Sequence, residues 1–340
     1  MSGRGRPGRP LSRRAALSGV AAVAATGFAP ARTRAAPRRD RLTIAGMPAT
    51  PTVLLARVLE TGALAPYVEA PQLQVWRTLD ELRAGVRSGA YDVVGLPTDA
   101  AAALFNGGAA IRLLDVVAWG LLYLVGRDAS VTRIEDLAGR RITVAFRGEA
   151  PDLIVRLVLR RLGLDPDRDV SLDYVATPAE TARRLLEGET DLAVVPEPLA
   201  TAILLRSAAS AAPVRRIADL TAVYGALTGR PRGLPKAGLA VSEALVETNP
   251  ALVTTLHRAS VAAASWVRAE PAAAARLGSE PLALPAAVIE GSLPFFRLDV
   301  VAAASVRTNL EQYFGELAAV APDVLGGSLP PARFYWGDPA

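Results

Sequence analysis

The fold of this chain follows from one stretch, YDVVGLPTD at residues 91–99, and from its counterpart, DLAVVPEP at residues 191–198. In each stretch an aspartate starts a short apolar run, and a proline ends it. Short apolar runs bounded by turn residues are typical of buried strands. Because each strand leads through a proline-marked turn into a helical pattern, the two stretches predict two α/β units of the same design.

The flanking sequence follows one scheme in both halves of the chain. Strand patterns alternate with helical patterns, which is typical of a parallel sheet with helices on both faces. In the first half we predict strands at 41–46, 74–77 and 91–96, with helices at 53–62, at 79–87 and after residue 97. In the second half we predict strands at 142–146, 170–175 and 191–195, with helices at 152–162, at 178–187 and after residue 198. The fold class is therefore α/β, with two similar Rossmann-like lobes.

The last third of the chain is predicted to be mostly helical. After a strand at 236–241, helical patterns occupy residues 250–270, 271–277, 285–292 and 300–320. This tail has no second sheet of its own, so we expect it to pack on the first lobe. The chain must then cross between the lobes twice, near 125–131 and within 224–237. We predict a first lobe of residues 41–127 plus 236–340 and a second lobe of residues 128–235.

The N-terminus carries two adjacent arginines, Arg13 and Arg14, before an Ala- and Gly-rich apolar run that reaches Ala31. Paired arginines before a weakly apolar segment are the signal of the twin-arginine export route. The run is shorter than the roughly 20 residues that span a bilayer. We therefore predict a cleaved twin-arginine signal peptide over residues 1–36. The alternative is an arginine-rich N-terminal segment of a cytosolic protein.

The positive charge of the chain belongs to this predicted leader. The chain has 38 basic and 33 acidic residues, a net charge of +5. Seven of the basic residues lie within residues 1–36, which contain no acid, so 31 basic and 33 acidic residues remain after it. The charge therefore gives no support for binding nucleic acid. Lys236 is the only lysine, an imbalance typical of GC-rich codon usage.

Composition also narrows the chemistry. The chain has no cysteine, which excludes disulfides, a thiol nucleophile, Cys/His metal sites and lipid attachment through an N-terminal cysteine. His257 is the only histidine, and it lies in a helical pattern that favours a solvated or core-edge role over catalysis. No Gly-x-Ser-x-Gly motif, phosphate-binding glycine loop or carboxylate pair stands out. We predict no cofactor and no metal.

Several motifs resemble those of a known family in their order and spacing. IEDLAGRRI at residues 134–142 resembles an "Asp-Leu-Lys-Gly-Lys" entry to a second lobe, and residues 185–193 and 195–198 resemble a second strand-and-turn signature. Residues 51–64, 249–253 and 329–335 match in the same order. The chain thus resembles, from about 41 to 335, the solute-binding proteins of ABC importers of the nitrate, sulfonate and taurine group. That group has the type II periplasmic fold and includes NMT1-like binders of a thiamine pyrimidine precursor.

The chain also departs from its relatives in two places. It lacks the Cys-rich motif of the pyrimidine-synthesising enzymes that share the fold. Its first loop, residues 47–52, lacks the polar richness that is common in nitrate binders.

A ligand is expected where the carboxyl ends of the strands from both lobes face each other. In the first lobe, Thr50 and Thr52 either cap a helix or offer hydroxyl groups to the ligand. Thr98 and Asp99 follow the third strand, with the same two alternatives. Trp119 is either a core residue or an aromatic face on which a ligand stacks.

In the second lobe, Arg147, Gly148 and Glu149 lie between a strand and a helix. Arg147 is suited to pair with a carboxylate or sulfonate, whereas a solvated pair of Arg147 with Glu149 is the alternative. Glu197, between two prolines, either faces the ligand or fixes the turn. Tyr224, near the second crossing, completes the candidates.

The resemblance implies a monomeric periplasmic protein, free of the membrane, that captures a small polar solute and delivers it to an ABC permease. No catalytic residues are expected. Two alternatives remain: an exported or same-fold enzyme of the pyrimidine-precursor or menaquinone type, and a ligand-sensing module of a membrane kinase.

Overall fold

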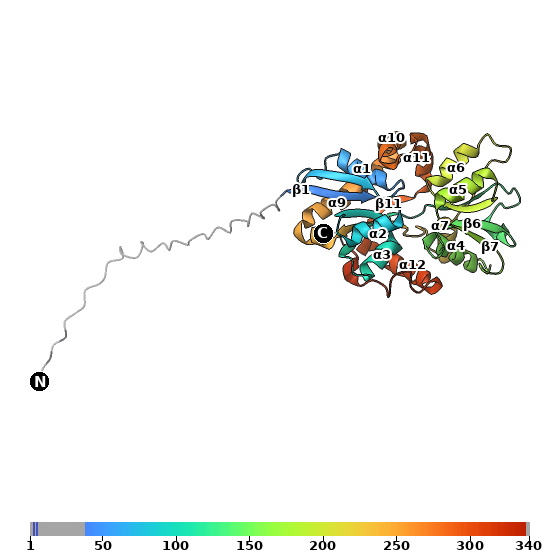
Figure 1. Cartoon of the computed structure of the whole chain (residues 1–340). Coiled ribbons are helices and arrows are strands. Elements are labelled where there is room, and N and C mark those ends of the chain that lie inside the picture. Colours follow the sequence, from blue (N-terminus) through green and yellow to red (C-terminus); the bar gives the residue numbers. More distant parts are fainter. Residues whose placement is uncertain (1–2, 4, 6–37, 338–340) are drawn as a thin grey trace. The chain divides into compact units, whose positions relative to one another are not determined.

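The computed structural model describes residues 3, 5 and 38–337 (Figure 1). The predicted twin-arginine motif and the cleavage region lie outside the described residues, so the leader at 1–36 stays a prediction. Within the described part, no helix combines the length and the apolar character that a membrane crossing requires.

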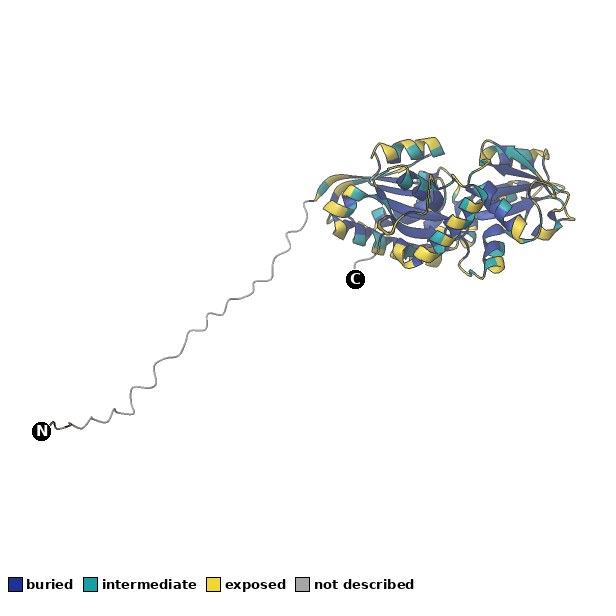
Figure 2. Cartoon of the chain, turned by 90° about the horizontal axis from the view of Figure 1, so that it is seen from below, coloured by how far each residue is buried: buried dark blue, intermediate teal, exposed yellow. Residues whose placement is uncertain are grey.

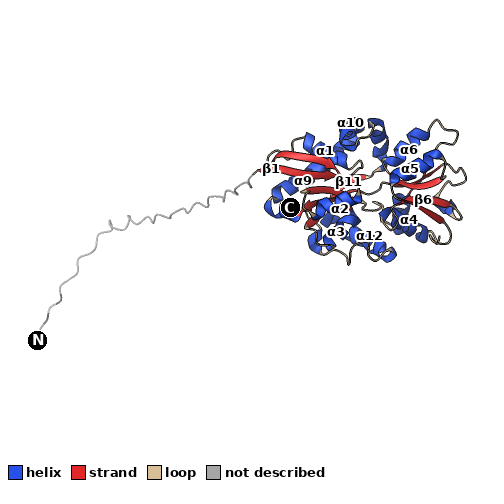
Figure 3. Ribbon diagram, viewed as in Figure 1, coloured by secondary structure: helices blue, strands red, loops and turns tan. Residues whose placement is uncertain are grey.

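Two sheets organise the structure, each the centre of one lobe (Figures 1 and 3). The first has six strands in the order β11-β4-β10-β3-β1-β2. They are β1 (Arg39–Gly46), β2 (Val68–Val75), β3 (Val93–Pro97), β4 (Ile111–Ala118), β10 (Ala237–Ser242) and β11 (Leu298–Ala302). The second has five strands in the order β7-β6-β8-β5-β9. They are β5 (Leu122–Gly126), β6 (Arg141–Ala145), β7 (Ser171–Val175), β8 (Leu192–Pro196) and β9 (Arg215–Asp219).

The two sheets share one topology, as the paired sequence stretches predict. In each, three parallel strands are followed by an antiparallel one: β2-β1-β3 by β10, and β7-β6-β8 by β5. The antiparallel strand begins where its neighbour ends, because Ala237 lies opposite Pro97 and Leu122 lies opposite Pro196. Each antiparallel strand also directly follows a crossing between the lobes. The residues that precede these two strands therefore reach the same edge as the carboxyl ends of the parallel strands.

Helices cover both sheets (Figure 3). Those of the first lobe are α1 (Thr52–Glu60), α2 (Leu79–Arg87), α3 (Thr98–Asn106), α8 (Glu243–Thr248), α9 (Pro250–Ala269), α10 (Pro271–Leu282), α11 (Ala286–Ser292) and α12 (Arg307–Val320). Those of the second are α4 (Ala150–Arg161), α5 (Pro178–Glu187), α6 (Leu199–Ser207) and α7 (Leu220–Thr228). Short 3₁₀ turns are η1 (Ile134–Leu137), η2 (Leu293–Phe295), η3 (Ala303–Val306) and η4 (Ala332–Phe334).

The structure differs from the sequence prediction in several details. Strand β2 spans Val68–Val75 rather than 74–77, and no strand was predicted at β4, β5 or β9. The first crossing lies at residues 119–121, between β4 and β5, rather than near 125–131, so residues 122–126 belong to the second sheet. Strand β11 occupies the start of the stretch predicted as a helix over 300–320, and α12 begins only at Arg307. The tail packs on the first lobe as predicted, and α11 and α12 also contact α6 and α4 of the second lobe.

The core lies at the sheets, and the outer helix faces are exposed (Figure 2). The central strands β3, β5, β8 and β10 are buried over nearly their whole length. Burial on both faces explains their unbroken apolar sequences, because strands covered by helices on two sides have no solvent face that needs polar side chains.

Candidate functional site

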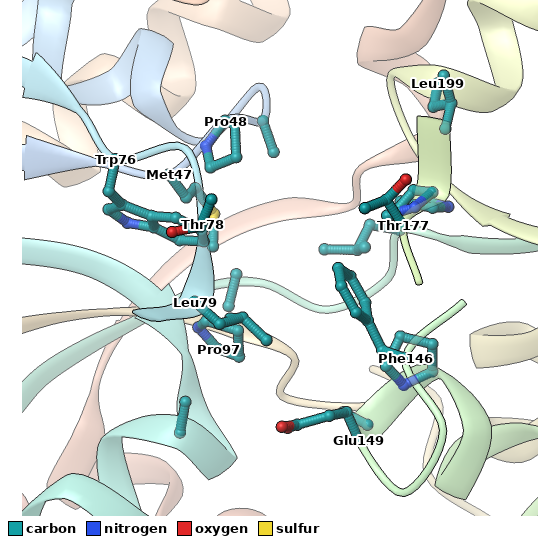
Figure 4. Close-up of a pocket in the computed structure, with 18 of the residues that line it drawn as sticks. Met47, Pro48, Trp76, Thr78, Leu79, Pro97, Phe146, Glu149, Thr177 and Leu199 are labelled. Atoms are coloured by element: carbon teal, nitrogen blue, oxygen red, sulfur yellow. The ribbon is translucent and has the colours of Figure 1, made fainter. Parts of the chain in front are cut away.

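A cleft of about 860 Å³ opens where the two lobes face each other (Figure 4). It is lined by the loops after β1, β3, β6 and β8, the four loops that the sequence predicted, and by the residues that precede β5 and β10. Residues after β2 and β7, within 76–83 and 177–179, also line it and were not predicted. Its walls are mostly apolar and include four prolines of these loops, Pro48, Pro97, Pro196 and Pro198.

Of the four helices that begin at these loops, α1, α3 and α4 have no side-chain cap, whereas the Glu197 carboxylate accepts from Thr201 N in the first turn of α6. The N-cap residues of α1, α3 and α6 are prolines, and that of α4 is Glu149; none of the four side chains caps its helix. The helices α2 and α5, in contrast, are capped by Thr78 and Thr177. Proline has no side-chain acceptor, so the first N–H groups of these helices rely on other partners. Helix N-termini of this kind favour negative or dipolar groups.

Two aromatic side chains form opposite walls of the cleft (Figure 4). Trp76 follows β2, and its indole Nε1 donates a hydrogen bond to Gly95 O at 2.8 Å, which fixes the ring beside β3. Phe146 follows β6 and has a φ angle of 61°, which is uncommon for a residue other than glycine. Strained backbone of this kind concentrates at functional sites. The two rings offer apolar faces to a ligand from both lobes.

The base of the cleft holds a buried ion pair. Lys236, the residue before β10, places Nζ 3.0 Å from Asp99 Oδ1, and both residues line the cleft. The register of β10 on β3 brings them together, because Ala237 lies opposite Pro97. Tyr313 of α12 donates its hydroxyl to the same Oδ1 at 3.4 Å. Burial, and then the charge of Asp99, raises the pKa of Tyr313 well above its ordinary value, so this hydroxyl remains a donor.

A second ion pair spans the cleft. Arg83 of α2, in the first lobe, donates to Glu149, at the start of α4 in the second lobe, over 2.7 Å. Figure 4 shows the Glu149 carboxylate directed into the cleft. The side chains are 36% and 38% exposed, so solvent screens the pair and its contribution to stability is below about 1 kcal/mol. Its effect is therefore on the arrangement of the lobes.

Breaking this pair is expected to widen the range of distances between the lobes. The cysteine-free chain accepts spin labels at two introduced cysteines on exposed positions, Ala262→Cys and Arg168→Cys. In that background Glu149→Gln should give a broader and longer distance distribution than the parent at low ionic strength. Arg83→Gln should give the same change, and about 0.5 M salt should abolish the difference. Identical distributions at low salt would contradict the role of this pair.

Glu197 lines the cleft, but its carboxylate is already engaged. Arg216 of β9 donates Nε to Glu197 Oε1 at 3.0 Å, and Thr201 N donates to Oε2 at 3.1 Å. The Arg216 guanidinium also lies 3.6 Å from the centre of the Phe295 ring. These contacts favour the alternative in which Glu197 fixes its turn.

Two arginines at the cleft have no acidic partner among the described residues. Arg147 lies over the Tyr174 ring at 5.0 Å, and the Arg77 guanidinium donates no hydrogen bond to another described residue. Both residues are exposed. The acids of the cleft, in contrast, are each paired: Asp80 and Glu149 with Arg83, Asp99 with Lys236, and Glu197 with Arg216. The rim of the cleft therefore carries the uncompensated positive charge.

The structure brings four of the ten predicted ligand residues to the cleft: Asp99, Arg147, Glu149 and Glu197. The three predicted threonines are buried elsewhere and cap no helix. Thr50 shares a hydrogen bond with Ser292, Thr52 donates to Met47 O, and Thr98 donates to Pro235 O.

The other three candidates also lie outside the cleft lining. Trp119 is a core residue whose Nε1 donates to Asp299 O at 2.9 Å. Gly148 has a φ angle of 78° and donates its N–H to Asp152, which explains the need for glycine. Tyr224 is buried against α12, where its hydroxyl binds Glu316.

Sequence reasoning missed Trp76, Phe146, Arg83 and Lys236. Trp76 carried a signal, since it lies next to the end of the strand predicted at 74–77. Lys236 carried a stronger one: a single lysine in a chain that otherwise uses arginine marks a position where arginine does not replace it. The prediction considered only residues that follow the carboxyl ends of parallel strands. Lys236 was missed because it lies before the start of an antiparallel strand, β10. Phe146 also carried a signal, since it is the last residue of the strand predicted at 142–146. Arg83 gave no comparable signal.

Among the described residues, no three His, Asp or Glu side chains are grouped so that they could hold a metal ion. His257, the only histidine, lies away from the cleft lining, with Nδ1 at 2.6 Å from Asp115 Oδ1.

With this geometry in place, comparison with known proteins identifies the family. A sequence model of the NMT1-like family matches residues 72–279. This match covers more than half of the chain, so the chain belongs to the NMT1-like family. A search among curated proteins found no match.

Solved structures establish the fold. An ABC transporter protein of Parabacteroides distasonis superposes with a TM-score of 0.72 at 22% identity, over 87% of this chain and 98% of the other. The periplasmic aliphatic sulphonate binding protein SsuA of Escherichia coli gives 0.69 at 17% identity, over 88% and 92%. The desulfurization enzyme DSZB gives 0.58 at 19% identity, over 86% and 94%. The two-lobed periplasmic-binding fold predicted from the sequence is thus confirmed, and the same fold also occurs in an enzyme.

Proposed function

We propose that this protein is an extracytoplasmic solute-binding protein, which captures a small organic molecule between its lobes and delivers it to the permease of an ABC importer. The observation that carries the proposal is the apolar cleft between two sheets of the same topology, at the edge where the helices that follow the parallel strands begin. Two lobes that enclose a ligand close on it by hinge motion, and this closure is what a permease distinguishes.

Among the candidate ligands, the cleft favours the organic ones, which are sulfonates, taurine and pyrimidines, over the inorganic anion nitrate. Trp76 and Phe146 offer large apolar faces. A small inorganic anion would lose its hydration there with little in return, whereas an organic body gains from burial. The exposed Arg77 and Arg147 at the rim would attract an anionic substituent.

Binding rather than catalysis is supported by the cleft residues. The chain has no cysteine, its only histidine is not a lining residue, and each acid of the cleft is held in an ion pair. The second candidate function is catalysis, because the enzyme DSZB has a similar fold. Export by the twin-arginine route, a periplasmic location and a monomeric state are part of the same proposal, and a permease gene beside this one would favour it over a sensor.

The proposal is tested with the mature protein and a panel of sulfonates, amino-sulfonates, carboxylates, pyrimidines and nitrate. An organic member should raise the melting temperature, since a ligand at 100 times its Kd adds about 2.7 kcal/mol to stability. Chromatography should recover that compound unchanged after incubation. No shift with any compound, or consumption of the bound one, would overturn the proposal.

Trp76→Ala is expected to weaken binding of that compound about tenfold, because aromatic faces contribute about 0.5–1.5 kcal/mol beyond their area. Trp76→Phe, which keeps an aromatic face, should bind within about threefold of wild type. Trp266→Ala is the control, because Trp266 lies on α9 and outside the cleft lining. It shows how much affinity is lost when a tryptophan is removed away from the cleft. Titration calorimetry gives all four affinities; a loss in Trp266→Ala as large as that in Trp76→Ala would contradict the assignment.

A further inference from the structure

The only lysine of the chain lies at the base of the cleft, in the second crossing between the lobes. Lys236 is 6% exposed and is fixed at both backbone groups: its N–H donates to Ala118 O at 3.0 Å, and its C=O accepts from Thr98 N at 3.2 Å. Its ammonium therefore has a defined place, set by the sheet rather than by a flexible loop.

The hydrogen bonds of the pair leave two N–H donors of Lys236 and one carboxylate oxygen of Asp99 without a partner among the described residues. An ammonium has three N–H donors, and Asp99 Oδ1 is the one acceptor that Lys236 Nζ has among the described residues. Asp99 Oδ1 also accepts from Tyr313, so Oδ2 has no donor among them. Asp99 is 4% exposed, and both side chains line the cleft. A group that enters the base of the cleft meets Nζ as a donor and Oδ2 as an acceptor.

The charges of the pair cancel, and this decides which group fits. A full anion attracted by Lys236 is repelled by Asp99 at nearly the same distance, in surroundings that screen poorly. A neutral group with its own acceptor and donor satisfies both partners without bringing a net charge out of water. The exposed arginines at the rim have no such counter-charge.

We propose that Lys236 and Asp99 determine the specificity of the cleft by binding a neutral amide-like group of the ligand, with Nζ donating to its oxygen and Oδ2 accepting from its N–H. The proposal rests on the proposed function, because it assigns part of the same cleft. It predicts that the base of the cleft prefers an amide to the acid of the same shape.

Two matched pairs test this preference: benzamide with benzoate, and benzenesulfonamide with benzenesulfonate. In wild type the amide of each pair should bind at least tenfold tighter than the acid. Asp99→Asn, which keeps the shape but leaves Lys236 uncompensated, should reverse the order in favour of the acid. The double variant Lys236→Met/Asp99→Leu should lose the preference. Glu316→Gln, on the α12 face that binds Tyr224, is the control and should keep it.

A lysine-specific probe gives a readout that does not depend on affinity. Selective ¹³C labelling of lysine marks only Lys236, because the chain has no other lysine, and it leaves all three N–H donors in place. The Lys236 Cε signal should shift on addition of benzamide, and it should be absent from the spectrum of the double variant. Circular dichroism melting of each variant separates loss of folding from loss of preference.

The outcomes separate the two proposals. If wild type binds the acid as tightly as the amide, or if it binds other panel compounds but neither pair, the specificity assignment is overturned and the proposed function stands. The same holds if Asp99→Asn, still folded, keeps the amide preference. If wild type binds neither pair and no compound of the panel, both proposals are overturned.

Discussion

Replacing Arg216 with methionine is expected to lower the free energy of unfolding by about 3–5 kcal/mol, because it leaves the Glu197 carboxylate buried without a counter-charge. The Glu197 side chain is fully buried, and Arg216 is its only cationic partner among the described residues. The Arg216 guanidinium lies over the Phe295 ring, and methionine leaves an unbranched apolar side chain at this position while it removes the charge. The loss therefore reports the removed cation, through the uncompensated Glu197 charge and the lost cation–π contact, and not a large cavity.

The double variant Glu197→Gln/Arg216→Met is the matched control. It removes both charges and retains the amide oxygen that accepts from Thr201 N, so its loss should be only about 1–2 kcal/mol. Urea denaturation of wild type, the single variant and the double variant measures the coupling. A double variant that is as unstable as Arg216→Met would show that the ion pair is not the cause.

Gly233→Ala is expected to cost about 2–5 kcal/mol, as the sum of about 1–2 for a left-handed backbone and about 1–3 for overpacking. Gly233 lies in the second crossing with a φ angle of 86°. A Cβ atom there would meet Thr221 Cγ2 at 2.5 Å and Trp119 O, in the first crossing, at 2.8 Å. The two crossings approach each other at this point, and the backbone oxygen cannot turn aside as a side chain would.

Gly229→Ala isolates the first of these terms, the cost of the left-handed backbone. Gly229 ends α7 with a φ angle of 68°, and its Cβ would meet nothing within 4 Å. Its cost should be the backbone term alone, about 1–2 kcal/mol. Urea denaturation of both variants gives the difference, and equal losses would contradict the close approach of the crossings.

The sequence predicted the parallel part of each sheet and missed much of the rest. The stretches at 91–99 and 191–198 correspond to β3 and β8 with the helices that follow them. The position of β5 in the second sheet depends on pairing with β8 and β9, and local periodicity does not encode pairing partners. The β11 segment is a short apolar run before an Ala-rich stretch, which hydrophobic periodicity does not distinguish from a helix.

For the site, the sequence located the loops better than the side chains. Asp99, Arg147, Glu149 and Glu197 reach the cleft, whereas the neighbouring Thr98 points into the core toward Pro235 O. Adjacent residues of one loop differ in direction because the helix that follows turns each side chain by a fixed angle from the last. A sequence fixes which loop meets the cleft, but the direction within it depends on the first turn of the helix.

The strand order also governs how the polypeptide is made. All five strands of the second sheet come from residues 122–219, so that sheet is complete early in synthesis. The first sheet needs β10 between β3 and β4, and these two strands have left the ribosome more than a hundred residues before β10 does. Until then both keep an unpaired edge open to other chains. A nascent or truncated product that stops before residue 237 therefore exposes the middle of the first sheet to aggregation.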